Sequence, residues 1–117
     1  MEDNDCIFCK IISGEIPAEK TYEDDNFIAF LDAKPKAVGH TILVSKNHFR
    51  NLLDMPASLG NEMLEGIKKV SLDLIKQKKA EGFNVIVNNE PVAGQVIFHA
   101  HIHIIPRKKD DGLKPLI

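Results

Sequence analysis

The sequence lacks several features that would place the chain in a special class. No apolar run exceeds five residues, far short of the ~20 needed to cross a bilayer, so we expect no membrane association. The formal net charge is only −2, from 15 basic and 17 acidic residues, so no overall field would attract nucleic acid. Repeats, linkers and low-complexity tracts are also missing. These absences favour one globular domain over residues 1–117.

The chain is also poor in cysteine, with two among its 117 residues. Its first ten residues are acidic, unlike a secretory signal or a transit peptide. We therefore expect no leader and a reducing compartment, which predicts a cytoplasmic protein. The two cysteines are spaced as Cys6-x-x-Cys9, and this spacing favours a metal or redox role over a structural disulfide.

Two segments have the apolar spacing of helices. The spacing of Ile7, Phe8, Ile11 and Ile12 predicts a short N-terminal helix that carries Cys6 and Cys9. The stripe from Leu59 to Leu74, with steps of three or four residues, predicts one long amphipathic helix. Asp54 is the expected N-cap of the long helix, and Gly82 is expected to close its C-terminus.

Five segments predict strands. In chain order they are Lys20–Glu23, Phe27–Leu31, Thr41–Val44, Asn84–Asn89 and Val96–Ile105. The short links between successive strands favour antiparallel pairing. The sequence therefore predicts an α+β fold, with an antiparallel sheet of about five strands and the helices packed on one face.

Three of the five histidines occupy alternate positions of the last predicted strand. Because side chains alternate along a strand, His99, His101 and His103 would share one face, and Ile102 would point to the core. The row could be a polar strand edge without function, or a pair of its imidazoles could bind a metal. All three do not readily meet at one ion, because they span about 13 Å.

A third interpretation uses all three imidazoles at a phosphate group. One ring can attack phosphorus directly, and a ring two residues away can donate a hydrogen bond to a phosphate oxygen. A pKa near ~6.5 would allow a neutral nucleophile to lie beside a charged donor at neutral pH.

The stretch His99-Ala100-His101-Ile102-His103-Ile104-Ile105 resembles the signature of the histidine-triad (HIT) superfamily, His-φ-His-φ-His-φ-φ with φ apolar. Residues 6–18, CIFCKIISGEIPA, resemble the N-terminus of its Hint-like branch. Residues 30–35, 39–44 and 46–48 also match in kind and order. The likeness extends over about residues 6–107.

The resemblance implies an enzyme that hydrolyses or transfers nucleoside monophosphates through a covalent nucleotidyl-histidine. It implies that His101 is the nucleophile, with four polar residues around the phosphate and the leaving group: His103, His40, Asn88 and Gln95. It also implies that Asp32 binds the ribose hydroxyls and that four apolar residues surround the base: Phe8, Ile11, Ile16 and Ile42. Plain alternatives remain, since Asp32 could start a loop, Asn88 could cap a strand and the apolar residues could serve packing alone.

The chain departs from the Hint-like pattern at one position. Many relatives have a serine after the Gly-Gln pair, where this chain has Val96. The missing hydroxyl could donate to the phosphate or to the leaving group, so the handling of the leaving group can differ. The nucleophile is not affected.

Cys6 and Cys9 supply half of a tetrahedral zinc site. A redox pair would need a thioredoxin-like βαβ setting, which the predicted strand order does not provide. His48 and His99 are the natural candidates for the other two ligands, and some bacterial-type HIT proteins resemble this arrangement. We expect a structural zinc ion, with two small buried thiols as the alternative.

These observations predict a hydrolase or transferase for purine nucleoside 5′-phosphoramidates or aminoacyl-adenylates. A dinucleoside polyphosphate hydrolase of the Fhit-like branch is the alternative enzyme. A zinc-containing nucleotide-binding adaptor without turnover is the alternative from another class. The resemblance also implies a homodimer and a purine nucleotide as the ligand. The charge balance and the short apolar runs predict no nucleic-acid or membrane partner.

Overall fold

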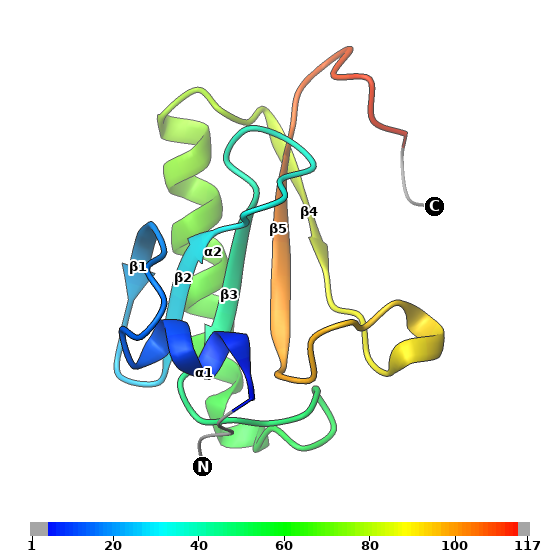
Figure 1. Ribbon diagram of the computed structural model, residues 1–117. Coiled ribbons are helices and arrows are strands. Elements are labelled where there is room, and N and C mark those ends of the chain that lie inside the picture. The colour runs from blue at the N-terminus through cyan, green and yellow to red at the C-terminus, as the bar shows by residue number, and fades with distance from the viewer. Residues whose placement is uncertain (1–4, 115–117) are drawn as a thin grey trace.

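A five-stranded antiparallel sheet lies between two helices in the computed structural model, which describes residues 5–114 (Figure 1). In chain order the elements are α1 (Ile7–Ile12), β1 (Lys20–Glu23), β2 (Phe27–Leu31), β3 (Thr41–Ser45), the 3-10 turn η1 (Ala57–Leu59), α2 (Gly60–Lys76), β4 (Gly82–Ile86), the 3-10 turn η2 (Pro91–Ala93) and β5 (His101–Arg107). The strands are ordered β1-β2-β3-β5-β4, and every neighbouring pair is antiparallel. The predicted α+β fold is confirmed.

The two helices cover opposite faces of the sheet, so the expectation that both pack on one face is wrong (Figure 1). Leu43 and Ile102 point toward the core beneath α2. Ile42 and Val44 alternate with Leu43 on β3 and pack with α1 instead. Every residue of β3 is buried, as expected for a central strand that is covered on both sides.

Both predicted ends of the long helix are wrong. The Asp54 carboxylate accepts a hydrogen bond from the Arg50 main-chain N–H, and α2 is entered through η1. At the other end the chain turns at Lys78, which has a φ of 61°. The N–H groups of Lys78 and Lys79 donate to the carbonyls of Ile75 and Leu74. This pattern is a Schellman motif, in which a lysine occupies the left-handed position that usually favours glycine. No helix within residues 5–114 is long and apolar enough to span a membrane.

The last two strands are displaced from their predicted ranges. β4 begins at Gly82, opposite Arg107, because β5 continues through Pro106 to Arg107. β5 begins only at His101, opposite Val44. The Ala100 N–H donates to the Phe49 carbonyl, away from the sheet ladder. His99 therefore precedes the strand rather than lying on it.

Candidate active site and metal site

The histidines form two clusters instead of one row. His101 and His103 project from β5 on the face that α1 covers, with ring centroids 4.9 Å apart. His40, the residue before β3, continues this cluster with its ring centroid 5.2 Å from that of His103. His99 packs against His48 at 4.8 Å and lies edge-to-face with Phe8 at 5.9 Å. Because β5 starts at His101, the strict alternation expected for the triad ends before His99.

The His101 ring is held as one tautomer by the main chain. Its Nδ1 lies 2.7 Å from the His99 carbonyl oxygen. A carbonyl can only accept, so Nδ1 carries the proton and Nε2 carries a free lone pair. Burial lowers the pKa of His101 below its usual value, which keeps the ring neutral. Nε2 has no hydrogen-bond partner within residues 5–114 and is therefore available as a nucleophile.

His103 belongs to a second hydrogen-bonded group with His40 and Asp32. The His103 Nδ1 lies 3.0 Å from the His40 Nε2, and the Asp32 carboxylate lies 3.4 Å from that same Nε2. Burial, with a smaller contribution from the charges of His101 and His40, lowers the pKa of His103 to about 4. A charged donor at neutral pH is therefore wrong for His103. Burial of the His103 ring on the α1 face of the sheet disfavours its charged form, so the imidazole is neutral.

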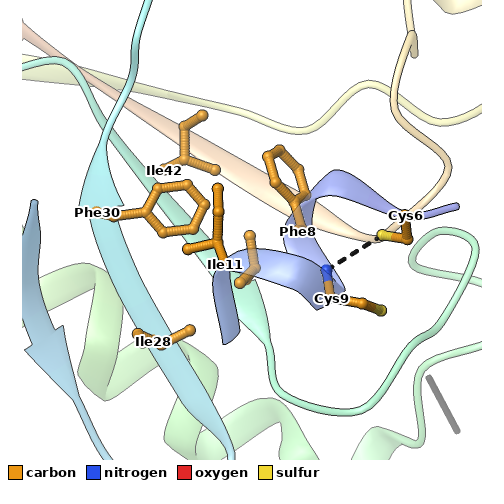
Figure 2. Close-up of a cluster of buried hydrophobic side chains, with 8 residues drawn as sticks. Cys6, Phe8, Cys9, Ile11, Ile28, Phe30 and Ile42 are labelled. Atoms are coloured by element: carbon orange, nitrogen blue, oxygen red, sulfur yellow. Dashed lines mark hydrogen bonds between the residues drawn. The ribbon is translucent and has the colours of Figure 1, made fainter. Parts of the chain in front are cut away.

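Three of the predicted base-contacting residues, Phe8, Ile11 and Ile42, lie in one buried cluster (Figure 2). Phe8 packs edge-to-face with His101 at 5.0 Å and with Phe30 at 5.5 Å. Ile11 and Ile42 are buried in the same cluster, and the half-buried Ile16 packs against it. Phe30 was not singled out from the sequence, since an aromatic on a strand usually indicates only core packing.

Gln95 uses its whole side-chain amide within the loop before β5. Its Oε1 accepts from the Glu90 N–H, and its Nε2 donates to the carbonyls of Arg50 and Ile97. Asn88 has no side-chain hydrogen bond within residues 5–114, and its amide lies 3.5 Å from the position of a Cβ atom added at Gly94. The roles expected for both residues at the phosphate stay predictions.

Cys6, Cys9, His48 and His99 form the second cluster, with one ligand atom of each within 4.8 Å of all the others. The His99 Nδ1 lies 3.3 Å from the Cys6 sulfur and 3.6 Å from the Cys9 sulfur. The His48 Nδ1 lies 3.3 Å from the Cys9 sulfur. Tetrahedral zinc with bonds of about 2.3 Å to sulfur and 2.0 Å to nitrogen requires separations of this size.

The protonation of His99 suits a metal ligand. Its Nε2 lies 2.7 Å from the Ser45 carbonyl oxygen, which can only accept. The proton is therefore on Nε2, and the Nδ1 lone pair faces the sulfurs. Without a cation, burial raises the pKa of Cys6 to about 11. The sequence alone gives no signal for the carbonyl of Ser45, since main-chain groups carry no residue-type pattern.

An antiparallel sheet with a His-x-His pair on its central region, joined by a buried histidine and a carboxylate, defines a histidine-triad protein. A model of the HIT domain matches residues 13–110. The chain belongs to the HIT family, as its sequence motifs predicted.

Curated relatives cover most of the chain. It is 46% identical over 110 residues to adenylylsulfatase HINT3 of Arabidopsis thaliana, covering 94% of this chain and 56% of that protein. It is 39% identical over 109 residues to adenosine 5′-monophosphoramidase HNT1 of Candida albicans, covering 90% of this chain and 72% of that protein. The chain thus spans little more than half the length of the first of these relatives.

Solved structures agree with the fold. A Streptococcus mutans UA159 protein matches with a TM-score of 0.92 and 43% identity, over 99% of this chain and 74% of that one. A zinc-bound histidine triad family protein from Mycobacterium smegmatis matches with a TM-score of 0.89 and 35% identity, over 94% of this chain and 80% of that one.

Proposed function

We propose that the chain hydrolyses adenosine 5′-phosphoramidates, or related adenylyl compounds, through a nucleotide bound covalently to His101. The observation that carries this proposal is the pairing of two neighbouring imidazoles. His101 offers a lone pair at Nε2, and the ring of His103 lies 4.9 Å away, with its Nδ1 in a hydrogen bond with the His40 Nε2. A nucleophile beside a hydrogen-bond donor suits a phosphate centre.

The reaction has two displacements at the α-phosphorus. The His101 Nε2 attacks and forms a phosphorus–nitrogen bond, while the bond to the leaving amine breaks and the amine departs with its electron pair, taking up one proton from solvent. The nucleotidyl-histidine is cationic, and its Nδ1–H keeps its bond to the His99 carbonyl. Water then attacks phosphorus, releases a nucleoside monophosphate and restores the neutral ring. Two displacements each have a lower barrier than a single hard one.

The nucleoside would lie over the cluster beside His101. We propose that the Asp32 carboxylate accepts hydrogen bonds from the ribose hydroxyls, since it is partly exposed at the edge of the cluster. The half-buried Ile16 and the ring of Phe8 would contact the base. Ile11 and Ile42 are at most 7% exposed, so their contribution is chiefly to support that surface.

The activities for which two relatives are named, adenylylsulfatase and adenosine 5′-monophosphoramidase, favour an adenine nucleotide with a small leaving group. Val96 is 81% exposed. Because valine has no hydroxyl, this position cannot donate the hydrogen bond that a serine of many relatives could give to the leaving group. We therefore expect the amine to depend on solvent or on Asn88 for hydrogen bonds.

We propose that Cys6, Cys9, His48 and His99 hold a structural zinc ion. When bound, the ion would tie the N-terminus of α1 to the segment that enters β5, and thereby fix Phe8 against His101. Four protein ligands complete a tetrahedral site, so we assign no catalytic step to the metal.

We also propose a homodimer formed by the outer edge of β4. Within residues 5–114, β4 is an end strand of the sheet. Phe83 and Val85 share one face of it and are 41% and 43% exposed. A second copy would pair with this edge and cover both side chains. Val85→Lys should then shift the mass in light scattering from dimer to monomer, while Leu72→Lys on α2 should not. A parent that is monomeric at micromolar concentration would refute the proposal.

Turnover of three compounds tests the proposed activity: adenosine 5′-phosphoramidate, adenylyl sulfate and diadenosine tetraphosphate. We expect kcat/KM to be highest for one of the first two, and we expect His101→Ala to lower it by about 10⁴-fold or more. Lys68→Ala, on the exposed side of α2, is the matched control. Preference for diadenosine tetraphosphate would overturn the substrate class, and full activity of His101→Ala would overturn the mechanism.

A further inference from the structure

The loop between β2 and β3 reaches the catalytic cluster through its main chain. The Lys36 N–H donates to the His40 Nδ1 at a distance of 3.0 Å. An N–H group can only donate, so the His40 Nδ1 must carry a lone pair. Burial lowers the pKa of His40, and the ring is neutral. Its single proton therefore lies on Nε2.

The position of the proton on His40 determines the position of the proton on His103. The His40 Nε2 lies 3.0 Å from the His103 Nδ1, so His40 donates and the His103 Nδ1 accepts. A neutral His103 then has its proton on Nε2, which has no partner within residues 5–114. Asp32 supports the same arrangement, because its carboxylate lies 3.4 Å from the His40 Nε2 and can only accept.

We propose that the main-chain N–H of Lys36 is a positioning group that sets His103 as a hydrogen-bond donor to the substrate. The catalytic part of this inference rests on the function proposed above. Without the Lys36 N–H, the chain of bonds could reverse: His40 would carry its proton on Nδ1, and His103 would donate from Nδ1 back to His40. The His103 Nε2 would then present a lone pair to the phosphate oxygens and repel them.

The proton on the His40 Nε2 also makes the group of Asp32, His40 and His103 a poor metal site. Ligand atoms of Asp32, His40 and His103 lie within 4.8 Å of one another, as those of the cysteine–histidine cluster do. A cation on the His40 Nε2 would force the ring proton onto Nδ1, against the Lys36 N–H. His99 has the opposite arrangement, because its proton is drawn to the Ser45 carbonyl and its Nδ1 stays open. The two main-chain contacts thus separate a metal-binding cluster from a catalytic one.

Long-range ¹H–¹⁵N correlation spectra of the ¹⁵N-labelled full chain at pH 7 test the proton positions without any substrate. We expect His40 and His103 both to be protonated on Nε2, and His101 on Nδ1. A His40 or His103 protonated on Nδ1 would overturn the inference. If the spectra agree and the protein turns over no nucleotide, the proposed function fails while the assignment of the protons stands.

Lys36→Pro removes the N–H, and Lys36→Ala retains it while removing the side-chain charge that faces His40 and His103. We expect the alanine variant to keep the protons on Nε2 of both rings. We expect the proline variant to lose this uniform pattern and to have a kcat about 10²-fold below that of the alanine variant, as for loss of one transition-state donor. Equal kcat values with unchanged spectra would refute the positioning role. If the proline variant does not fold, the parent spectrum decides.

Discussion

Placing a carboxylate at Ile102 is the most direct perturbation of the strand that presents His101 and His103. Ile102 is only 1% exposed and pairs with Leu43 in the centre of the sheet. Its side chain points into the core beneath α2, on the face opposite His101 and His103. An aspartate at this position has no ion-pair partner within the core cluster, so Ile102→Asp should unfold the chain.

The expected loss combines two contributions. A buried aspartate becomes neutral at pH 7, and protonating it from a normal pKa of about 3.9 costs roughly 4 kcal/mol. Loss of the apolar side chain and the space it leaves costs about 2–5 kcal/mol more. Because domains of this size are stable by only about 5–15 kcal/mol, the variant should be largely unfolded at 25 °C.

Thermal and urea unfolding followed by circular dichroism would measure this effect. Ile102→Ala isolates the packing contribution and should cost about 2–5 kcal/mol. Val96→Asp is the matched control, since Val96 is 81% exposed and lies just before His99; its cost should stay within about 0.5 kcal/mol. If Ile102→Asp melted at the temperature of Val96→Asp, the assignment of the two faces of β5 would be wrong.

Three further predictions concern stability. Lys78→Gly should raise the free energy of unfolding by about 1 kcal/mol, because glycine adopts the left-handed conformation of Lys78 without strain; a loss of stability in urea titrations would contradict the Schellman assignment. The pKa of His103 falls to about 4 on folding, so the unfolded chain binds more protons between pH ~6.5 and 4, and stability should drop as the pH falls through that window, by up to about 3 kcal/mol. Urea titrations of His103→Gln should show a smaller drop than the parent, and an equal drop would exclude His103 as a cause. Removing metal with a chelator should lower the Tm of the parent by several degrees, and Cys9→Ala should be insensitive; metal analysis should find one zinc per chain, and two would contradict the protonation proposed for His40.

The fold was predictable where the pattern of side chains alone decides it. Apolar patterning and short links predicted five antiparallel strands, and β1 and β2 were predicted with the bounds they have in the structure. The short helix was expected to carry Cys6, which instead forms the N-cap of α1. The failures lie where main-chain bonds decide. The Gln95 side chain binds the Ile97 carbonyl and the Ala100 N–H donates to the Phe49 carbonyl, so these main-chain groups are not available for a continuous strand from Val96. A Schellman turn at Lys78 ends α2 well before Gly82.

The candidate site divides in the same way. Residue types at their spacing predicted which side chains meet, and Cys6, Cys9, His48 and His99 do come together. Which nitrogen of each imidazole holds the proton depends on the carbonyls of His99 and Ser45 and on the N–H of Lys36. No residue type encodes these contacts, so the proton positions inferred for His99 and His103 emerge only from the fold.

The proposed reaction requires that His101 becomes covalently bound to the nucleotide. Rapid mixing with adenosine 5′-phosphoramidate, acid quench at millisecond times and peptide mass spectrometry would detect this intermediate. We expect an adenylyl group on the peptide that contains His101, appearing before free nucleotide and absent from His101→Ala. Product formation at the parent rate with no adduct at any time, or an adduct on another histidine, would rule out His101 as the nucleophile.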